Sequence, residues 1–231
     1  MKKLFPQNNS AKNIIINMIT AFIALFVNGF GVYLTIHANI GVSPWDVLTM
    51  GISKTAGILF GNASILVSFI VLAVDIIMKE PIGLAMLIDA ITVGKAIDFF
   101  NYIAVVPEPK NLFASIVMMV IGLFILAYTQ YFYMNVSLGC GPRDTLLVGL
   151  KRKISKVPIG IVSICLLSVV TFSGWLLGGQ VGIGTLICAF LAGPIMQLVF
   201  ELVHFDVTRI RHQRISQSFR VFAAARKKQQ K

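Results

Sequence analysis

The chain has 231 residues, of which 57% are apolar and only 13% are charged, and its formal net charge is +11. A soluble domain is about 45–50% apolar and about 25% charged, so this composition excludes an ordinary water-soluble enzyme and indicates a membrane protein. The basic residues gather before the first apolar run, around residues 143–156 and in the tail after residue 209. Such clusters between apolar runs are typical of membrane orientation rather than of nucleic-acid binding.

About six apolar stretches are long enough to cross a bilayer core of about 30 Å as helices. In chain order they cover residues 14–38, 58–78, 83–102, 112–136, 158–177 and 184–203. Two shorter segments, residues 44–54 and 142–155, reach only about 16–21 Å as helices, so we interpret them as re-entrant or interfacial half-helices. A count of about eight spans, in which both short segments cross, fits the positive-inside rule equally well, and length alone favours about six.

The distribution of positive charge predicts that both chain termini lie in the cytoplasm, since basic residues prefer that side. We expect a cytoplasmic N-terminus, a first unit, an external loop, a second unit and a basic amphipathic tail, at residues 1–13, 14–102, 103–111, 112–203 and 204–231. The tail is expected to lie on the anionic inner leaflet of the lipid bilayer.

The two units are related by an internal repeat. The segment GVSPWD at residues 41–46 matches GCGPRD at residues 139–144 with an offset of 98, and an offset of 99 then aligns three glycine pairs, Gly61/Gly160, Gly83/Gly182 and Gly94/Gly193. Because each unit contains an odd number of crossings on the count of about six, the second copy is expected to be inverted. Inverted repeats around broken helices are a recurring plan of secondary transporters, with the site between the halves.

These two segments, together with GKAID at residues 94–98, resemble the YczE/YitT-like bacterial integral membrane proteins. The resemblance covers most of residues 14–203, and SPWD at residues 43–46 is its most distinctive part. It implies a multi-pass protein of the bacterial cytoplasmic membrane. It implies little about activity, because the family is largely uncharacterised and some of its members are linked to secondary-metabolite production without a settled mechanism.

The half-helices supply the first candidate site residues. Ser43, Pro44 and Asp46 have the form of a helix start, with a capping serine, proline at the first position and an acid that reaches back to the cap. On one interpretation Asp46 and Asp144 only satisfy backbone donors. On the other, the two helix N-termini direct partial positive charge toward a shared cavity and Arg143 adds a full charge, which would suit a small anionic or zwitterionic solute.

Ionisable residues within the third apolar stretch are the second group of candidates, namely Asp89, Lys95 and Asp98. A charge at the bilayer centre costs about 2.5–3.5 kcal/mol on insertion scales, so such residues are functional candidates by default. Lys95 and Asp98 are three positions apart and therefore share a helix face, where they can also pair and merely neutralise each other. Asp75 lies near Lys79 and the end of its stretch, and we expect it to be a surface acid.

The functional hypothesis is a membrane protein that moves or binds a small solute between the half-helices. Its site is expected to be shaped and tuned by Ser43, Asp46, Arg143, Asp144, Asp89, Lys95 and Asp98. The alternative is a non-transporting accessory or regulatory membrane protein that, for example, supports secondary-metabolite production. We expect no enzymatic activity, metal, cofactor or nucleic-acid partner, because no corresponding motif occurs, and homo-oligomerisation stays open.

Overall fold

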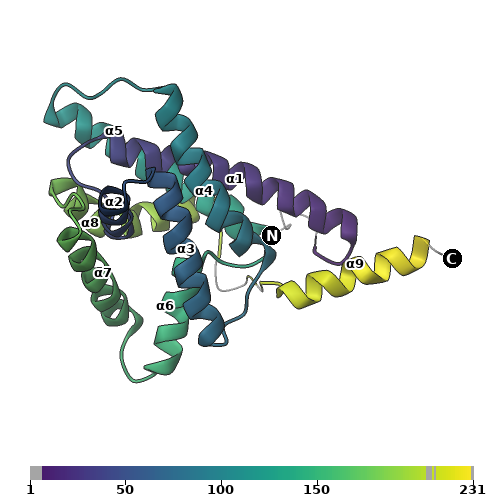
Figure 1. Cartoon of the computed structure of the whole chain (residues 1–231). Coiled ribbons are helices and arrows are strands. Elements are labelled where there is room, and N and C mark those ends of the chain that lie inside the picture. Colours follow the sequence, from purple (N-terminus) through teal and green to yellow (C-terminus); the bar gives the residue numbers. More distant parts are fainter. Residues whose placement is uncertain (1–6, 207–209, 211, 230–231) are drawn as a thin grey trace.

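A computed structural model describes residues 7–206, 210 and 212–229 of the chain. All regular secondary structure within these residues is helical, as the composition predicts. Figure 1 shows how the helices are arranged. In chain order they are α1 (Ala11–His37), α2 (Pro44–Ala56), α3 (Phe60–Ile77), α4 (Leu84–Ile103), α5 (Leu112–Asn135), α6 (Pro142–Lys153), α7 (Ile159–Leu176), α8 (Ile183–Leu202) and α9 (Ile215–Gln229).

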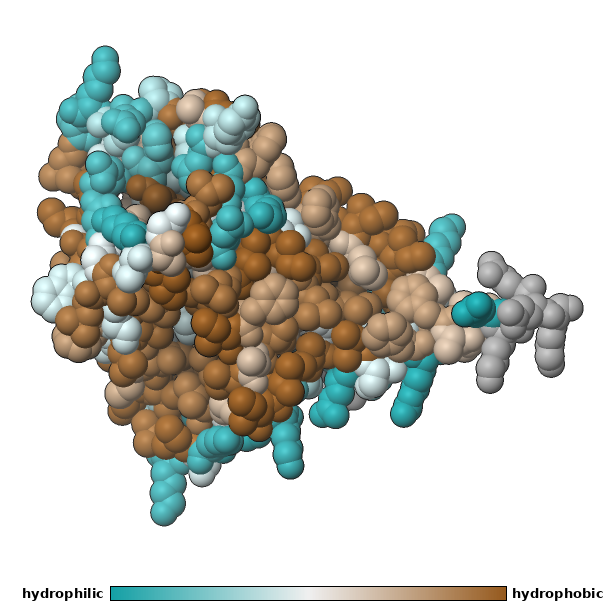
Figure 2. Space-filling view, viewed as in Figure 1, coloured by the Kyte–Doolittle hydropathy of each residue, from teal (hydrophilic) through white to brown (hydrophobic). Residues whose placement is uncertain are grey.

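Among the described helices, α1, α3, α5, α7 and α8 are long and apolar enough to cross a membrane. The chain is therefore an integral membrane protein. Figure 2 shows apolar side chains over the middle of this face, with polar side chains gathered toward its upper end and lower edge. Helix α4 has 20 residues, which is long enough for a span. It contains three ionisable residues, however, and is therefore not among the five described helices that are apolar enough to cross a membrane. The count of about six spans stays a prediction.

The two short segments form separate helices, as predicted. Helix α2 has 13 residues and α6 has 12, which gives lengths of about 20 and 18 Å. Both helices are therefore shorter than the bilayer core of about 30 Å. Each begins at a proline, Pro44 in α2 and Pro142 in α6, because the first turn needs no proline N–H and the fixed φ angle suits a helix start.

Each short helix packs against a long helix of the other unit. Helix α2 of the first unit packs against α7 of the second, and α6 of the second unit packs against α3 of the first. Helix α1 packs against α4, α5 packs against α8, and α1 crosses α5 between the units. With the offsets of 98 and 99, each of these contacts has its counterpart in the other unit. The short helices are thus each held by a helix of the opposite unit.

The turns before the short helices also correspond. Gly41 has a φ angle of 107° and Gly139 a φ angle of 128°, a backbone conformation that glycine adopts without steric cost. The N–H of Gly184 donates to the carbonyl oxygen of Ile40 at 2.7 Å, and the N–H of Ala85 donates to that of Leu138 at 3.1 Å. These two hydrogen bonds occupy equivalent positions under the same offsets. They join each turn to the start of α8 or α4 in the opposite unit.

One pair of helices breaks the correspondence. Helix α3 packs closely on α4, where a Cβ atom added to Gly61 would overlap the carbonyl oxygen of Gly94. The aligned glycines of the second unit are Gly160 in α7 and Gly193 in α8, and a Cβ atom added to either would meet no atom within 4 Å. Among the described helices, α7 and α8 make no packing comparable to that of α3 and α4. The two units therefore differ in how their last two helices meet.

The basic tail forms a helix over residues 215–229, within the predicted tail at 204–231. The N–H of Ile215 donates to the carbonyl oxygen of Ile82 and the N–H of Gln213 to that of Ser137, both at 2.8 Å, and α9 contacts α1. Burial lowers the pKa of His212 in this connection. Residues 1–6, 207–209, 211 and 230–231, parts of the predicted cytoplasmic ends, lie outside the described residues. Contact of the tail with lipid stays a prediction.

Candidate functional site

The first turns of the two short helices face each other. The guanidinium of Arg143 in α6 lies 3.7 Å from the carboxylate of Asp46 in α2, and its Cζ atom lies 5.3 Å from the ring centroid of Trp45. Asp46 is buried, at 5% exposure, so its charge needs this partner. The ion pair and the contact with the Trp45 ring connect the two units.

Ser43 supports this arrangement in a way that differs from the capping interaction expected from the sequence. Ser43 does occupy the capping position of α2, but its hydroxyl makes no capping hydrogen bond to a backbone N–H. The hydroxyl instead donates to the Oδ2 atom of Asp46. Because the other carboxylate oxygen, Oδ1, faces Arg143, Asp46 is held between a neutral donor and a cation. Ser43 thus positions Asp46 and does not line the cavity.

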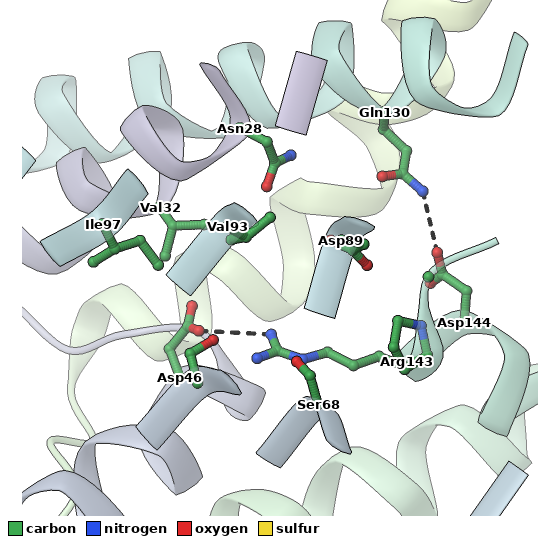
Figure 3. A pocket seen from close by; sticks show the side chains of 13 residues that line it. Asn28, Val32, Asp46, Ser68, Asp89, Val93, Ile97, Gln130, Arg143 and Asp144 are labelled. Carbon is green, nitrogen blue, oxygen red and sulfur yellow. Dashed lines mark hydrogen bonds and ion pairs between the residues drawn. The ribbon is translucent and has the colours of Figure 1, made fainter. Parts of the chain in front are cut away.

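A cavity of about 180 Å³ opens between the two helix starts and α1, α3, α4 and α5. Figure 3 shows Arg143 extending along it toward Asp46, with Asp89 and Asp144 at its other end. Its walls are polar around the two helix starts, whereas α1 and α4 contribute both polar and apolar side chains. The lining residues are Asn28, Val32, Asp46, Ser64, Ser68, Asp89, Val93, Ile97, Gln130, Gly141, Pro142, Arg143 and Asp144.

Three carboxylates and one guanidinium surround this cavity. Asp144 accepts a hydrogen bond of 3.1 Å from the side-chain amide of Gln130. Asp89 of α4 reaches the start of α6, where a Cβ atom added to Gly141 would lie 2.7 Å from its Oδ2 atom. The absence of a side chain at Gly141 is therefore what lets Asp89 approach α6. With Asp46, these acids outnumber the single Arg143, so the lining carries an excess of negative charge when all four groups are ionised.

Lys95 and Asp98 lie outside the cavity lining. They were predicted to share a helix face, but each one bonds to α3 instead of to the other. The ammonium of Lys95 donates to the Oδ1 atom of Asn62 at 2.9 Å, and the Oδ1 atom of Asp98 accepts from the N–H of Gly61 at 2.7 Å. Asp98 therefore satisfies one of the unpaired N–H groups at the start of α3. Both residues fasten α4 to α3.

The sequence interpretation missed several lining residues. Ser64 and Ser68 are buried one turn apart on α3, and Asn28 and Gln130 come from α1 and α5. Ser64 is aligned with Ser163 by the repeat, which is the one signal that singles it out. Asn28 and Gln130 lie in apolar runs that also contain Tyr33, Tyr128 and Tyr131, and tyrosines near the ends of such runs more often form an interfacial belt than a binding site. Within the described residues, no group of three or more His, Cys, Asp or Glu side chains is placed to hold a metal ion.

Comparison with known proteins gives a family and three relatives of unknown activity. Residues 15–201 match the model of a family of unknown function (DUF6198). The chain is 28% identical to an uncharacterized membrane protein, YczE, of Bacillus subtilis (strain 168), over 81% of this chain and 89% of that protein. It is 31% identical to an uncharacterized protein of Haemophilus influenzae, over 78% of this chain and 81% of that protein.

A third relative is the uncharacterized protein YyaS of Bacillus subtilis (strain 168), with 29% identity over 79% of this chain and 92% of that protein. No solved structure gave a significant match to the chain. The resemblance inferred from the two repeated segments is confirmed by the YczE match.

Proposed function

The chain belongs to the family of unknown function DUF6198, and we propose that it carries a small solute across the bacterial cytoplasmic membrane through its central cavity. The ion pair of Arg143 and Asp46 is the observation that carries this proposal. It brings charged side chains from the first turns of two short helices to one cavity. Broken or half-length helices that meet at a polar cavity are the usual binding-site construction of secondary transporters.

The charges around the cavity narrow the class of solute. Asp46 is already paired with Arg143, whereas Asp89 and Asp144 lie at the other end of the cavity with Gln130 as the neutral donor. A cationic amino group fits between these two acids, because it offsets part of their uncompensated negative charge in a poorly solvated site. Of the solutes considered from the sequence, a zwitterion is favoured over an anion. The volume of about 180 Å³ suits a small molecule of this kind.

Two observations support movement of the protein around the site. The exchanged helix contacts and the equivalent hydrogen bonds of the two turns support an inverted repeat. The close contact at Gly61 and Gly94, set against the open space at Gly160 and Gly193, supports two alternative states. In one state α3 and α4 are closed, and in the other α7 and α8 close in the same way while α3 and α4 separate. Each state exposes the cavity to one side of the membrane.

Solute binding provides the first test. The purified chain is expected to be stabilised by one or more zwitterionic amino acids or small amines in a thermal-unfolding screen. At a concentration about 100-fold above Kd, the midpoint Tm should rise by about 5 °C or more. The Asp144→Asn variant should bind the same solute at least about tenfold more weakly, because it loses the charge facing the solute.

The matched control for this screen is Lys95→Gln, which changes a charged residue of α4 outside the cavity and should leave Kd unchanged. Equal stabilisation of the wild type and the Asp144→Asn variant would place the solute elsewhere. If no solute stabilises the wild type, the alternative of a non-transporting accessory protein is favoured.

The inverted arrangement predicts the membrane side of each short helix. Lys54 lies near the end of α2 and Lys153 near the end of α6, and both are exposed. In a background without the three native cysteines, we expect Lys54→Cys to react with an impermeant thiol reagent from the outside and Lys153→Cys only from the inside. Labelling in intact cells and in inverted vesicles measures this difference. Labelling of both positions from the same side would contradict the inverted repeat.

A further inference from the structure

Asp75, which was expected to be a surface acid, is buried at the end of α3. Its exposure is 0%, and neither of its carboxylate oxygens accepts a hydrogen bond from the residues that the structure describes. The expectation was wrong because it relied on the nearness of Asp75 to Lys79 along the chain. In the fold, α6 and the connection between α3 and α4 cover this end of the helix, and the sequence spacing does not show this. A buried carboxylate without a partner is rare, because ionising it there costs far more free energy than in water.

A second acid lies beside Asp75. Glu80 is also buried, and its backbone N–H donates to the carbonyl oxygen of Asp75 at 3.0 Å, which keeps the two residues adjacent. The carboxylate of Glu80 pairs with Arg152 of α6 at 3.0 Å. Arg152 thus compensates the charge of Glu80 and leaves that of Asp75 without compensation.

The turns of α3 that precede Asp75 pack among apolar side chains. Leu48 and Ile52 of α2, and Leu146 and Leu150 of α6, pack with Val67 and Val71 of α3 in one hydrophobic cluster. Gly149 of α6 lies against Glu80, where an added Cβ atom would come within 2.9 Å of the Cγ atom of Glu80. Lys79, the remaining charged neighbour along the chain, is exposed. Because Asp75 is fully buried and Arg152 is paired with Glu80, a bound cation is what would neutralise its charge.

We propose that Asp75, next to Glu80, binds one monovalent cation, either a proton or Na⁺. The three ionisable groups carry two negative charges and one positive charge, so one bound cation makes the cluster neutral. The same elements reach the central cavity. Ser64 and Ser68 share the buried face of α3 with Asp75, and α6 carries Arg143 at one end and Arg152 at the other. The binding of this cation does not depend on the proposed function. A role for it as the coupling ion of a carrier does rest on the proposed function.

The test measures how stability depends on each cation. The full chain in lipid nanodiscs is unfolded thermally in two series, one over pH 6–8.5 without Na⁺, and one over Na⁺ concentration at fixed pH and ionic strength. A bound proton predicts that Tm falls by up to about 4 °C per pH unit as pH rises toward the pKa of Asp75 in the folded state, because only the folded state still holds the proton there, and that Tm levels off at higher pH. A bound Na⁺ predicts a rise of about 5 °C at about 100-fold above Kd.

The isosteric Asp75→Asn variant should lose whichever dependence the wild type shows, while the exposed acid variant Glu201→Gln should retain it. A dependence that persists unchanged in Asp75→Asn, or no dependence on either cation in the wild type, would overturn the proposal. If Asp75→Asn does not fold, the proposal is tested on the wild type by its reaction with dicyclohexylcarbodiimide, an apolar reagent that modifies buried protonated carboxyl groups. Modification of Asp75 that rising pH or added Na⁺ suppresses supports the site, and an Asp75 that stays unmodified under all these conditions refutes it.

This test is independent of the solute screen. Loss of the ion dependence in Asp75→Asn without any stabilising solute would keep the cation site and refute the proposed carrier site. A stabilising solute without any dependence of Tm on either cation would support the proposed carrier site and refute the cation site.

Discussion

Replacing Gly61 with alanine is expected to lower Tm by about 5–10 °C or to prevent folding. The added Cβ atom would overlap the carbonyl oxygen of Gly94 and lie 2.5 Å from the carboxylate of Asp98. Forcing a methyl group into such a contact costs about 1–3 kcal/mol, or more where the obstacle is backbone, and about 1 kcal/mol shifts Tm by about 2–4 °C in a chain of this size. The substitution would also displace the Asp98 carboxylate and so weaken its hydrogen bond from the N–H of Gly61.

The sequence alignment of the two units supplies the matched control. Gly160 occupies the aligned position in α7, and an added Cβ atom there meets no atom within 4 Å. Gly160→Ala should therefore leave Tm within about 1 °C of the wild type, or raise it slightly because alanine favours a helix over glycine. Thermal unfolding of both variants in the same lipid measures the difference. Equal losses in the two variants would contradict the asymmetry between the units.

The helices and the starts of the short helices follow from local signals in the sequence. Runs of apolar residues set the long helices, and Pro44 and Pro142 mark where α2 and α6 begin. The repeated segments also led to the hypothesis that Asp46, Arg143 and Asp144 surround one cavity, and all three line that cavity in the structure. These features could be predicted because proline, glycine and charge act over a few residues, and because the repeat relates positions far apart in the chain.

The partners of ionisable residues could not be predicted in the same way. The spacing of Lys95 and Asp98 allows a pair on one helix, but it contains no information about α3, whose Asn62 and Gly61 are the actual partners. Asp75 is near Lys79 in sequence but is covered in the fold. Both outcomes depend on which helices pack together, and a pattern of apolar residues around a membrane helix does not specify a neighbour because lipid and protein are equally apolar.

The second large effect is expected from a cross-link between α7 and α8. Gly61 and Gly94 bring α3 and α4 into close contact, and the proposed second state brings Gly160 and Gly193 equally close. The double variant Gly160→Cys/Gly193→Cys, with Cys140, Cys165 and Cys188 replaced by serine, should then form a disulfide under mild oxidation, since this bond needs Cα atoms about 4.4–6.8 Å apart. The disulfide would hold the protein in the state in which α7 and α8 are closed.

Solute uptake by this variant tests the central claim, that the protein carries a solute by alternating between two packings. The variant is reconstituted into liposomes, and uptake from a mixture of isotopically labelled amino acids and small amines is measured before oxidation, after oxidation and after reduction. Each single-cysteine variant, which cannot form the bond, serves as the control. We predict that the reduced variant accumulates at least one solute, that oxidation reduces this uptake by at least about tenfold, and that reduction restores it. Uptake that is unchanged by a fully formed disulfide, or no uptake of any solute by the folded wild type, would contradict the account.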